Sequence, residues 1–205
     1  MAGPRRGGRS TGTAPRRRLS PLRCIAIALA VVIVVAGLAV LIFWLAVRPA
    51  PVEYTVDGAS VRGFNITARG DALNATFDLT LRADNRRNRK VALYYDSFEV
   101  AVWYGEQMLA FTEAAPFFQP RRNVTRIEAA PAAREAPLLP DVARNIKHDR
   151  SAGELPVEVR VRARIRFKVG VVKTRHYMLR VYCPQVIIKL SSPTSFDRVY
   201  CDVDI

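Results

Sequence analysis

The apolar positions of the chain form one continuous block, which is followed by a long alternating region. From Cys24 to Val47 the sequence runs CIAIALAVVIVVAGLAVLIFWLAV without a charged side chain. A helix of that length rises roughly 36 Å, enough to cross a hydrocarbon core of about 30 Å. A core helix of a soluble protein would keep a polar face, and this block has none. The pattern predicts one transmembrane helix at residues 24–47.

A cleaved signal peptide is the competing interpretation of the same block. The apolar region of a signal peptide usually has about 7–15 residues and ends at a small-x-small cleavage site. Here the block is longer, and Arg48-Pro49 stands where the cut would be expected. We therefore expect the helix to be retained as a signal anchor.

The region from residue 48 to residue 205 has the alternating, β-branched pattern of half-buried strands. Its clearest strand is Val157–Val169, where apolar and charged side chains strictly alternate. Other strands are expected at Asn74–Arg82, Phe98–Tyr104 (with a hairpin turn at Gly105-Glu106), Val124–Ala130 and Lys173–Leu190. Only Leu138–Lys147, with Leu139, Val142 and Ile146 on one side, is predicted to be a short helix. Consecutive strands with short turns and one solvated face predict an all-β domain, an antiparallel β-sandwich.

Basic residues flank the apolar block unequally. Residues 1–23 contain seven arginines and no acid, whereas the first twenty residues after the block contain only two basic residues, Arg48 and Arg62. The positive-inside rule predicts a cytosolic tail at residues 1–23 and an exported domain at residues 48–205. The tail is rich in Gly, Ser, Thr, Pro and Arg, so we expect it to be disordered. Two roles stay open for its arginines: contact with anionic inner-leaflet lipids, or setting the topology alone.

Three N-glycosylation sequons follow the apolar block and none precedes it. They begin at Asn65, Asn74 and Asn123. Such sequons receive glycans only on the lumenal side of the secretory route, so their positions agree with export of the domain.

The chain has three cysteines. Cys183 and Cys201 are the two in the predicted exported domain, where an oxidising compartment favours a disulfide. The alternative is a pair of buried free thiols. Cys24 lies at the cytosolic edge of the predicted helix, where it could be S-acylated or could pack against lipid as an apolar side chain.

The predicted strand Val157–Val169 places five cations on its outward face. They are Arg160, Arg162, Arg164, Arg166 and Lys168, called the basic stripe below. Repulsion between them is costly unless anions or carboxylates lie nearby. The stripe could bind acidic cell-wall polysaccharide or lipid headgroups. The alternative is a solvated face paired with acids of the adjacent strand, including Glu99.

The formal net charge of +14 raises the question of whether the chain binds nucleic acid. No helix-turn-helix, zinc-finger or RNA-binding signature occurs, so no nucleic-acid partner is expected.

Asp202-Val203-Asp204 matches the Asp-x-Asp pattern with which glycosyltransferases hold a metal bound to a nucleotide sugar. Without a βαβ pattern, an acidic chain end is the favoured interpretation. His148 and His176 lie far apart and have no ligand spacing, and no nucleophile elbow, Walker or dinucleotide motif is present. We expect no enzyme, no cofactor and no metal site.

Several segments, in order, resemble a known plant family. They are Asn88–Asp96 (NRKVALYYD), Pro116–Pro120 (PFFQP), the arginine-alternating strand ending in Lys168-Val169-Gly170, and the ending from Cys183 to Cys201. With the basic tail and membrane helix, they resemble the harpin-induced-like (NHL) proteins, which carry a late embryogenesis abundant group-2 domain. The family usually shows Asn-Pro-Asn before its Tyr-Asp segment; here residues 83–88 (ADNRRN) lack the proline, so we expect that turn to differ.

The resemblance implies a sandwich similar to fibronectin type III, a location at the plasma membrane or plasmodesmata, and a role in plant defence or stress. It supplies no catalytic residues. Our leading hypothesis is a non-enzymatic interaction protein that links the plasma membrane to acidic wall polysaccharide, anionic lipid or other membrane proteins in defence signalling. The alternative is a structural protein that protects membranes during dehydration and has no specific ligand.

Overall fold

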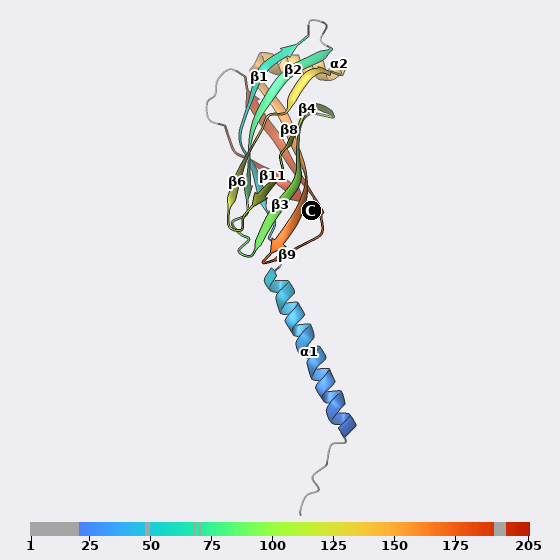
Figure 1. The fold of residues 1–205 in the computed structure, drawn as a ribbon. Coiled ribbons are helices and arrows are strands. Elements are labelled where there is room, and N and C mark those ends of the chain that lie inside the picture. Colours follow the sequence, from blue (N-terminus) through green and yellow to red (C-terminus); the bar gives the residue numbers. More distant parts are fainter. Residues whose placement is uncertain (1–20, 48–49, 68, 70, 191–195) are drawn as a thin grey trace, which may run out of the picture. The chain divides into compact units, whose positions relative to one another are not determined.

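The computed structural model describes residues 21–47, 50–67, 69, 71–190 and 196–205 (Figure 1). The chain divides into two compact units, Met1–Ala46 and Val47–Ile205, and each is described by itself. The predicted tail lies outside the described residues except for its last three.

The first unit contains one long helix, α1, at Pro21–Val47. It begins three residues before the predicted start, because proline is well suited to the first turn of a helix. Its 27 residues rise roughly 40 Å. Residues 21–42 form a segment long and apolar enough to cross a membrane. The side chains described along it are exposed on every side, as expected for a helix whose solvent is lipid.

The second unit is built almost entirely from strands, and every strand pairing in it is antiparallel, as predicted. The strands are β1 (Glu53–Ile66), β2 (Ala72–Asp84), β3 (Val91–Tyr104), β4 (Gln107–Ala114), β5 (Phe117–Gln119), β6 (Val124–Ala129), β7 (Ala132–Pro137), β8 (Glu154–Val169), β9 (Val172–Lys173), β10 (Tyr177–Lys189) and β11 (Val199–Asp204). The predicted strand Lys173–Leu190 is thus divided into β9 and β10.

The strand pairings close on themselves. The order β3-β4-β7-β2-β1-β11-β10-β8 returns to its start because β8 also pairs with β3. Along one edge β11 bridges β1 and β10, and along the other a single residue pair, Phe111 with Ala132, joins β4 to β7. This closed ring leaves fewer unpaired backbone groups for aggregation. The all-β, antiparallel architecture is as predicted, and its division into the two sheets of a sandwich stays a prediction.

The core lies inside this ring, and it follows from alternation along the strands. In β8 the odd-numbered residues from Leu155 to Phe167 are buried, and in β2 the odd-numbered residues from Leu73 to Ala83 are buried. Burying side chains of this size supplies most of the folding free energy, at about 25 cal/mol per Å² of apolar area. The predicted inward faces of these two strands are confirmed, apart from Val169, which is half-buried.

The short helix, α2, lies at Pro140–Ala152 and not at Leu138–Lys147. Proline again takes the first turn, while the backbone N–H of Leu138 donates to the carbonyl of Asp71. The predicted inward residue Leu139 is consequently 57% exposed, whereas Ile146 is fully buried. Gly153, with φ of 83°, ends the helix in the left-handed conformation that glycine adopts without strain. Figure 1 shows α2 and β9 at opposite ends of the domain.

Candidate interaction surface

The basic stripe lies on the outer face of β8, between β3 and β10. Arg162 and Arg164 are exposed, and the other three members are half-buried. Strand periodicity alone puts the five cations on one face, since alternate side chains of a strand point the same way. The five cations differ in the residues that lie beside them on β3 and β10.

Arg166 and Arg160 are each held by a carboxylate. Nε of Arg166 donates to Oδ2 of Asp96 at 2.8 Å while Nη2 donates to Oδ1, a bidentate pair. These hydrogen bonds hold the pKa of Asp96 below its usual value, although partial burial works in the opposite direction. Nη2 of Arg160 donates to Oε2 of Glu158 at 2.7 Å. The acid partners are therefore Asp96 and Glu158, and not Glu99 as suggested from the sequence.

Aromatic rings also contact the half-buried cations. The guanidinium of Arg160 lies 4.3 Å from the ring centre of Trp103 and 5.7 Å from that of Tyr182. Nζ of Lys168 lies 5.9 Å from the rings of Tyr94 and Phe118. Such cation–π contacts stabilise a charge without neutralising it.

Arg162 and Arg164 have no carboxylate within 4.0 Å in the part of the domain that is described. In register, Arg162 stands between Glu99 on β3 and Arg180 on β10. Arg180 is itself exposed, with Nη1 3.9 Å from Oδ2 of Asp204. We call Arg162, Arg164 and Arg180 the exposed arginine cluster. Like charges on directly paired positions destabilise a sheet unless an anion approaches them.

The Asp-x-Asp sequence at the chain end lies on β11. Asp202 and Asp204 are exposed on the same face, and Asp204 is near Arg180. Among the described residues, no three or more His, Cys, Asp or Glu side chains are grouped so that they could hold a metal ion.

Cys183 and Cys201 form a disulfide with an S–S distance of 2.07 Å, as predicted. The bridge joins β10 to β11, and its Cys183 end is fully buried in the core. Closing a loop of this length stabilises the fold by about 3 kcal/mol. Cys24 is an exposed free thiol in the first turn of α1, and its acylation stays a prediction.

The three sequons lie at different places on the domain. Asn65 is exposed on β1, and Asn123 is exposed in the turn before β6. Asn74, on β2, is half-buried, and its Oδ1 accepts a hydrogen bond from the backbone N–H of Glu135 at 2.9 Å. Attachment of glycans to these residues stays a prediction.

The turn before β3 contains a pair of buried asparagines whose role the sequence did not reveal. Asn88 N–H donates to the carbonyl of Asn85 at 3.1 Å, which closes a turn around Arg86 and Arg87 without the family's proline. The Asn88 amide also exchanges two hydrogen bonds with the backbone of Ala50: Nδ2 donates to the carbonyl at 2.8 Å, and Oδ1 accepts from the N–H at 2.8 Å. We call this exchange the Asn88 clasp. The only signal in the sequence was Asn-x-x-Asn flanking two arginines.

Residues of the motifs YYD and PFFQP form a chain of buried hydrogen bonds. Nε2 of Gln119 donates to the carbonyl of Ala83 at 2.8 Å, so its Oε1 accepts from the hydroxyl of Tyr95 at 3.0 Å. The Tyr95 oxygen in turn accepts from the hydroxyl of Tyr54. Burial raises the pKa of both tyrosines, so both stay neutral at physiological pH. The ring of Tyr95 stacks on Phe117 at 4.2 Å, so these motif residues build the core rather than a surface site.

Comparison with known proteins gives consistent matches. The family model of the late embryogenesis abundant protein LEA_2 matches residues 80–183, which include Tyr95, Gln119 and the basic stripe. An uncharacterized protein of Arabidopsis thaliana is 33% identical over 91% of this chain and 85% of its own length. NDR1/HIN1-like proteins 10 and 2 of the same plant are each 30% identical, over 84% and 80% of this chain and 78% and 70% of their own lengths.

A solved structure from Archaeoglobus fulgidus aligns with a TM-score of 0.31 and 8% identity over 63% of this chain and 97% of its own, too low to add to the description of the fold. The sequence matches decide the family. This chain belongs to the LEA_2 family of late embryogenesis abundant proteins and is a relative of the NDR1/HIN1-like proteins of plants.

Proposed function

We propose that the chain is a membrane-anchored, non-enzymatic interaction protein of the plant cell surface that acts in defence or stress responses. Its family and its NDR1/HIN1-like relatives support a role in plant stress or defence. The long apolar helix α1 supports membrane anchoring. The charged outer face of β8 supports a binding role.

The proposed topology is a cytosolic N-terminus, α1 as a signal anchor, and the strand domain outside the plasma membrane, with plasmodesmata as a second location. The arginines at residues 5–23 support this orientation, because basic residues stay on the cytosolic side. The disulfide supports an oxidising compartment. Sequons at Asn65, Asn74 and Asn123 are compatible with it.

The proposed ligand is an acidic cell-wall polysaccharide, bound at the exposed arginine cluster. The observation that carries this proposal is the juxtaposition of Arg162 and Arg180 on paired positions, with Arg164 two residues further along β8. Glu99 is paired with Arg162 on the other side, but within the described part no carboxylate oxygen lies within 4.0 Å of Arg162 or Arg164. Guanidinium groups form strong bidentate hydrogen bonds with carboxylates, which recur along such a polymer. Several exposed pairs acting together give binding that weakens as salt is added.

Retention on immobilised pectin at low ionic strength tests this ligand. We expect the triple variant Arg162→Gln, Arg164→Gln, Arg180→Gln to lose retention. Arg166 is left unchanged because it holds Asp96, so that its loss would mix stability with binding. A matched control replaces three other exposed arginines with glutamine and should keep full retention: Arg126, Arg134 and Arg144. The triple variant is called the cluster variant below. If it and the wild type are retained equally, the proposed ligand is contradicted.

The family name supports a second candidate, a membrane-protective protein induced by drying that needs no specific ligand. It predicts protection of liposomes during dehydration that does not saturate with a defined ligand and that persists in the cluster variant. Loss of protection in that variant would favour the interaction protein instead.

A further inference from the structure

One end of the strand domain, the end that carries β9, presents exposed cations from separate turns. The turn between β2 and β3 supplies Arg89 and Lys90, and the turn before β6 supplies Arg121 and Arg122. We call these four the basal patch. The two turns are joined, because Arg122 N–H donates to the carbonyl of Asn88 at 3.1 Å and Asn85 N–H donates to that of Asn123 at 2.9 Å.

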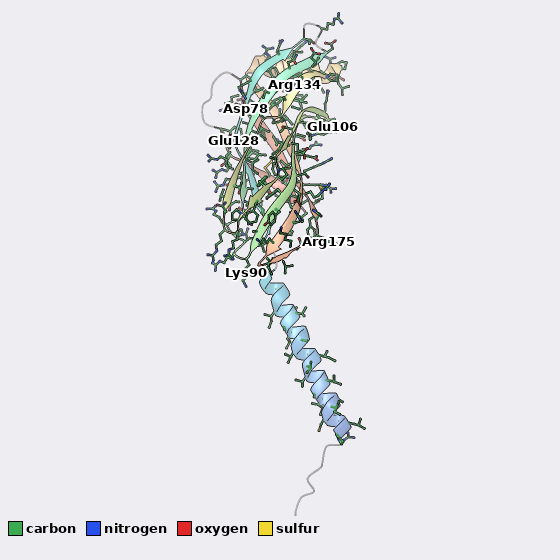
Figure 2. The ribbon with its side chains drawn as sticks, viewed as in Figure 1. Asp78, Lys90, Glu106, Glu128, Arg134 and Arg175 are labelled. Atoms are coloured by element: carbon green, nitrogen blue, oxygen red, sulfur yellow. A yellow bond between two sulfur atoms is a disulfide. The ribbon has the colours of Figure 1, made fainter. Side chains whose placement is uncertain are left out.

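The β8–β9 turn lies beside the same end, since Val91 of β3 pairs with Val169 of β8. In Figure 2, Lys90 and Arg175 mark this end, while Arg134 lies toward the opposite one. At the tip of the turn Val171 is 95% exposed and Val172 is 64% exposed, next to the exposed Lys173. Cations with apolar side chains between them are the composition expected of a surface that lies on lipid headgroups.

The positive charge of the basal patch is not balanced by acids. Two nearby carboxylates are already occupied: Asp84 lies 2.6 Å from Arg86, and Glu53 lies 2.9 Å from Arg87. Within the described ranges, none of the four patch residues has a carboxylate within 4.0 Å. The patch therefore keeps its full charge for an external anion.

Covalent connection limits how far this end can be from the membrane. The Asn88 clasp binds Ala50 to the turn that carries Arg89 and Lys90. Only residues 48 and 49 separate Ala50 from Val47, the last residue of α1. Three fully extended steps reach roughly 11 Å. That reach is similar to the Debye length of about 10 Å at 0.1 M salt, so the connection permits the patch to approach headgroups within their electrostatic range.

We propose that the basal patch docks on anionic lipid headgroups of the bilayer that contains the chain's own α1. The inference rests on the membrane anchoring stated in the proposed function, but it is independent of the polysaccharide ligand, because the exposed arginine cluster is made of other residues. Docking restricts the orientations of the domain about its short connection and makes them depend on lipid charge. The Asn88 clasp fixes Ala50, near the start of the domain, to the turn that carries Arg89 and Lys90.

Docking has a consequence for glycosylation. Asn123 directly follows Arg122 and is exposed at the same end. A glycan on Asn123 would stand between the patch and the headgroups. The docked protein therefore carries Asn123 without a glycan, whatever the state of Asn65 and Asn74, and mass spectrometry of the protein from plant membranes reads this directly.

Energy transfer in nanodiscs tests the docking on the full chain. The Cys24→Ser variant receives one cysteine, Val171→Cys, for a donor dye, and an acceptor dye is placed on a trace of headgroup-labelled lipid. The discs contain phosphatidylcholine alone or phosphatidylcholine and phosphatidylserine in equal parts. We expect higher transfer in the anionic discs, and we expect added salt to return it to the level of the neutral discs. A donor at Arg134→Cys, toward the other end of the domain (Figure 2), should not show this gain.

Two variants assign the effect to the patch. Glutamine at the four patch positions should abolish the difference in energy transfer between the two lipids. Lysine at Arg89, Arg121 and Arg122 keeps the charge and should preserve that difference, which would also show that substituted turns still fold. The cluster variant Arg162→Gln, Arg164→Gln, Arg180→Gln serves as the control and should dock normally.

Equal transfer in both lipids, an unchanged difference in the glutamine variant, or a fully glycosylated Asn123 would overturn the proposal. So would release of the docked domain by a small excess of soluble pectin fragments that occurs equally in the cluster variant, since the patch would then be a polysaccharide site. A chain that does not enter nanodiscs at all would instead contradict the membrane anchoring of the proposed function.

Discussion

The buried chain from Tyr54 through Tyr95 to Gln119 makes an unusual stability prediction, because its hydrogen bonds have a fixed direction. Gln119 can only accept at Oε1, since its Nε2 donates to Ala83. The Tyr95 hydroxyl therefore donates its single hydrogen to Gln119 and accepts a hydrogen bond from the Tyr54 hydroxyl. All three side chains are almost fully buried, so no water replaces a lost partner.

The magnitudes follow from which groups lose a partner. Tyr54→Phe removes one hydrogen bond and leaves no buried donor unpaired, so we expect a loss of about 1 kcal/mol in the free energy of unfolding. Tyr95→Phe leaves the Tyr54 hydroxyl and Gln119 Oε1 both unpaired and should cost about 2–4 kcal/mol. In the double variant only Gln119 Oε1 is unpaired, so it should lose about 1–2 kcal/mol, less than Tyr95→Phe alone.

The assay is urea unfolding of the full chain in nanodiscs, followed by the β-sheet signal in far-ultraviolet circular dichroism. Equal m-values across the four proteins would show that the midpoints report stability. Adding Tyr54→Phe to Tyr95→Phe is thus expected to raise the free energy of unfolding above that of Tyr95→Phe alone. Additive losses, or a double variant less stable than Tyr95→Phe, would refute the assigned direction of the chain.

Three further predictions use the same unfolding assay. Replacing both Cys183 and Cys201 with alanine should lower the free energy of unfolding by about 3 kcal/mol, and reductant should then have no further effect. Asn88→Ala removes three hydrogen bonds of a buried amide and should cost about 2–3 kcal/mol. Arg166 lowers the pKa of Asp96, so their pair contributes stability that is complete above about pH 4, the usual aspartate value, and is lost as pH falls through the lower folded-state pKa. Asp96→Asn should therefore be less stable near neutrality and should lose less stability than wild type on acidification below about pH 4, and parallel acid profiles would contradict the pair.

Alternation along a strand was the signal that the sequence carried best. Each apolar residue in Asn74–Arg82 is buried because a strand with one solvated face must point every second side chain inward. β1 was not assigned bounds because its sequence, EYTVDGASVRGFNI, has glycines and polar residues in place of a regular alternation. Register shifts at Val56/Gly58 and Arg62/Asn65 interrupt its pairing with β2, so its inward face changes along its length.

The surface was predicted in part, for a related reason. The five stripe residues could be identified from one strand, but their partners depend on how β3 lies beside β8. A register shift in β3 between Tyr95 and Ser97 lets Asp96 reach Arg166 and places Glu99 opposite Arg162. A shift of this kind has no local sequence signal.

Contacts between residues far apart in sequence were beyond reach. Asn88 and Ala50 are 38 residues apart, and their exchange of hydrogen bonds is visible only in the folded domain. The same holds for Arg180, which becomes part of the exposed arginine cluster only because β10 pairs with β8.

Glycosidase digestion of the chain expressed in plant cells tests the membrane-anchored, exported arrangement most directly. The account predicts a membrane-bound protein whose gel mobility increases after removal of N-glycans, and no such change when Asn65, Asn74 and Asn123 are all glutamine. A protein without N-glycans whose strand domain also resists protease added outside intact protoplasts would contradict it.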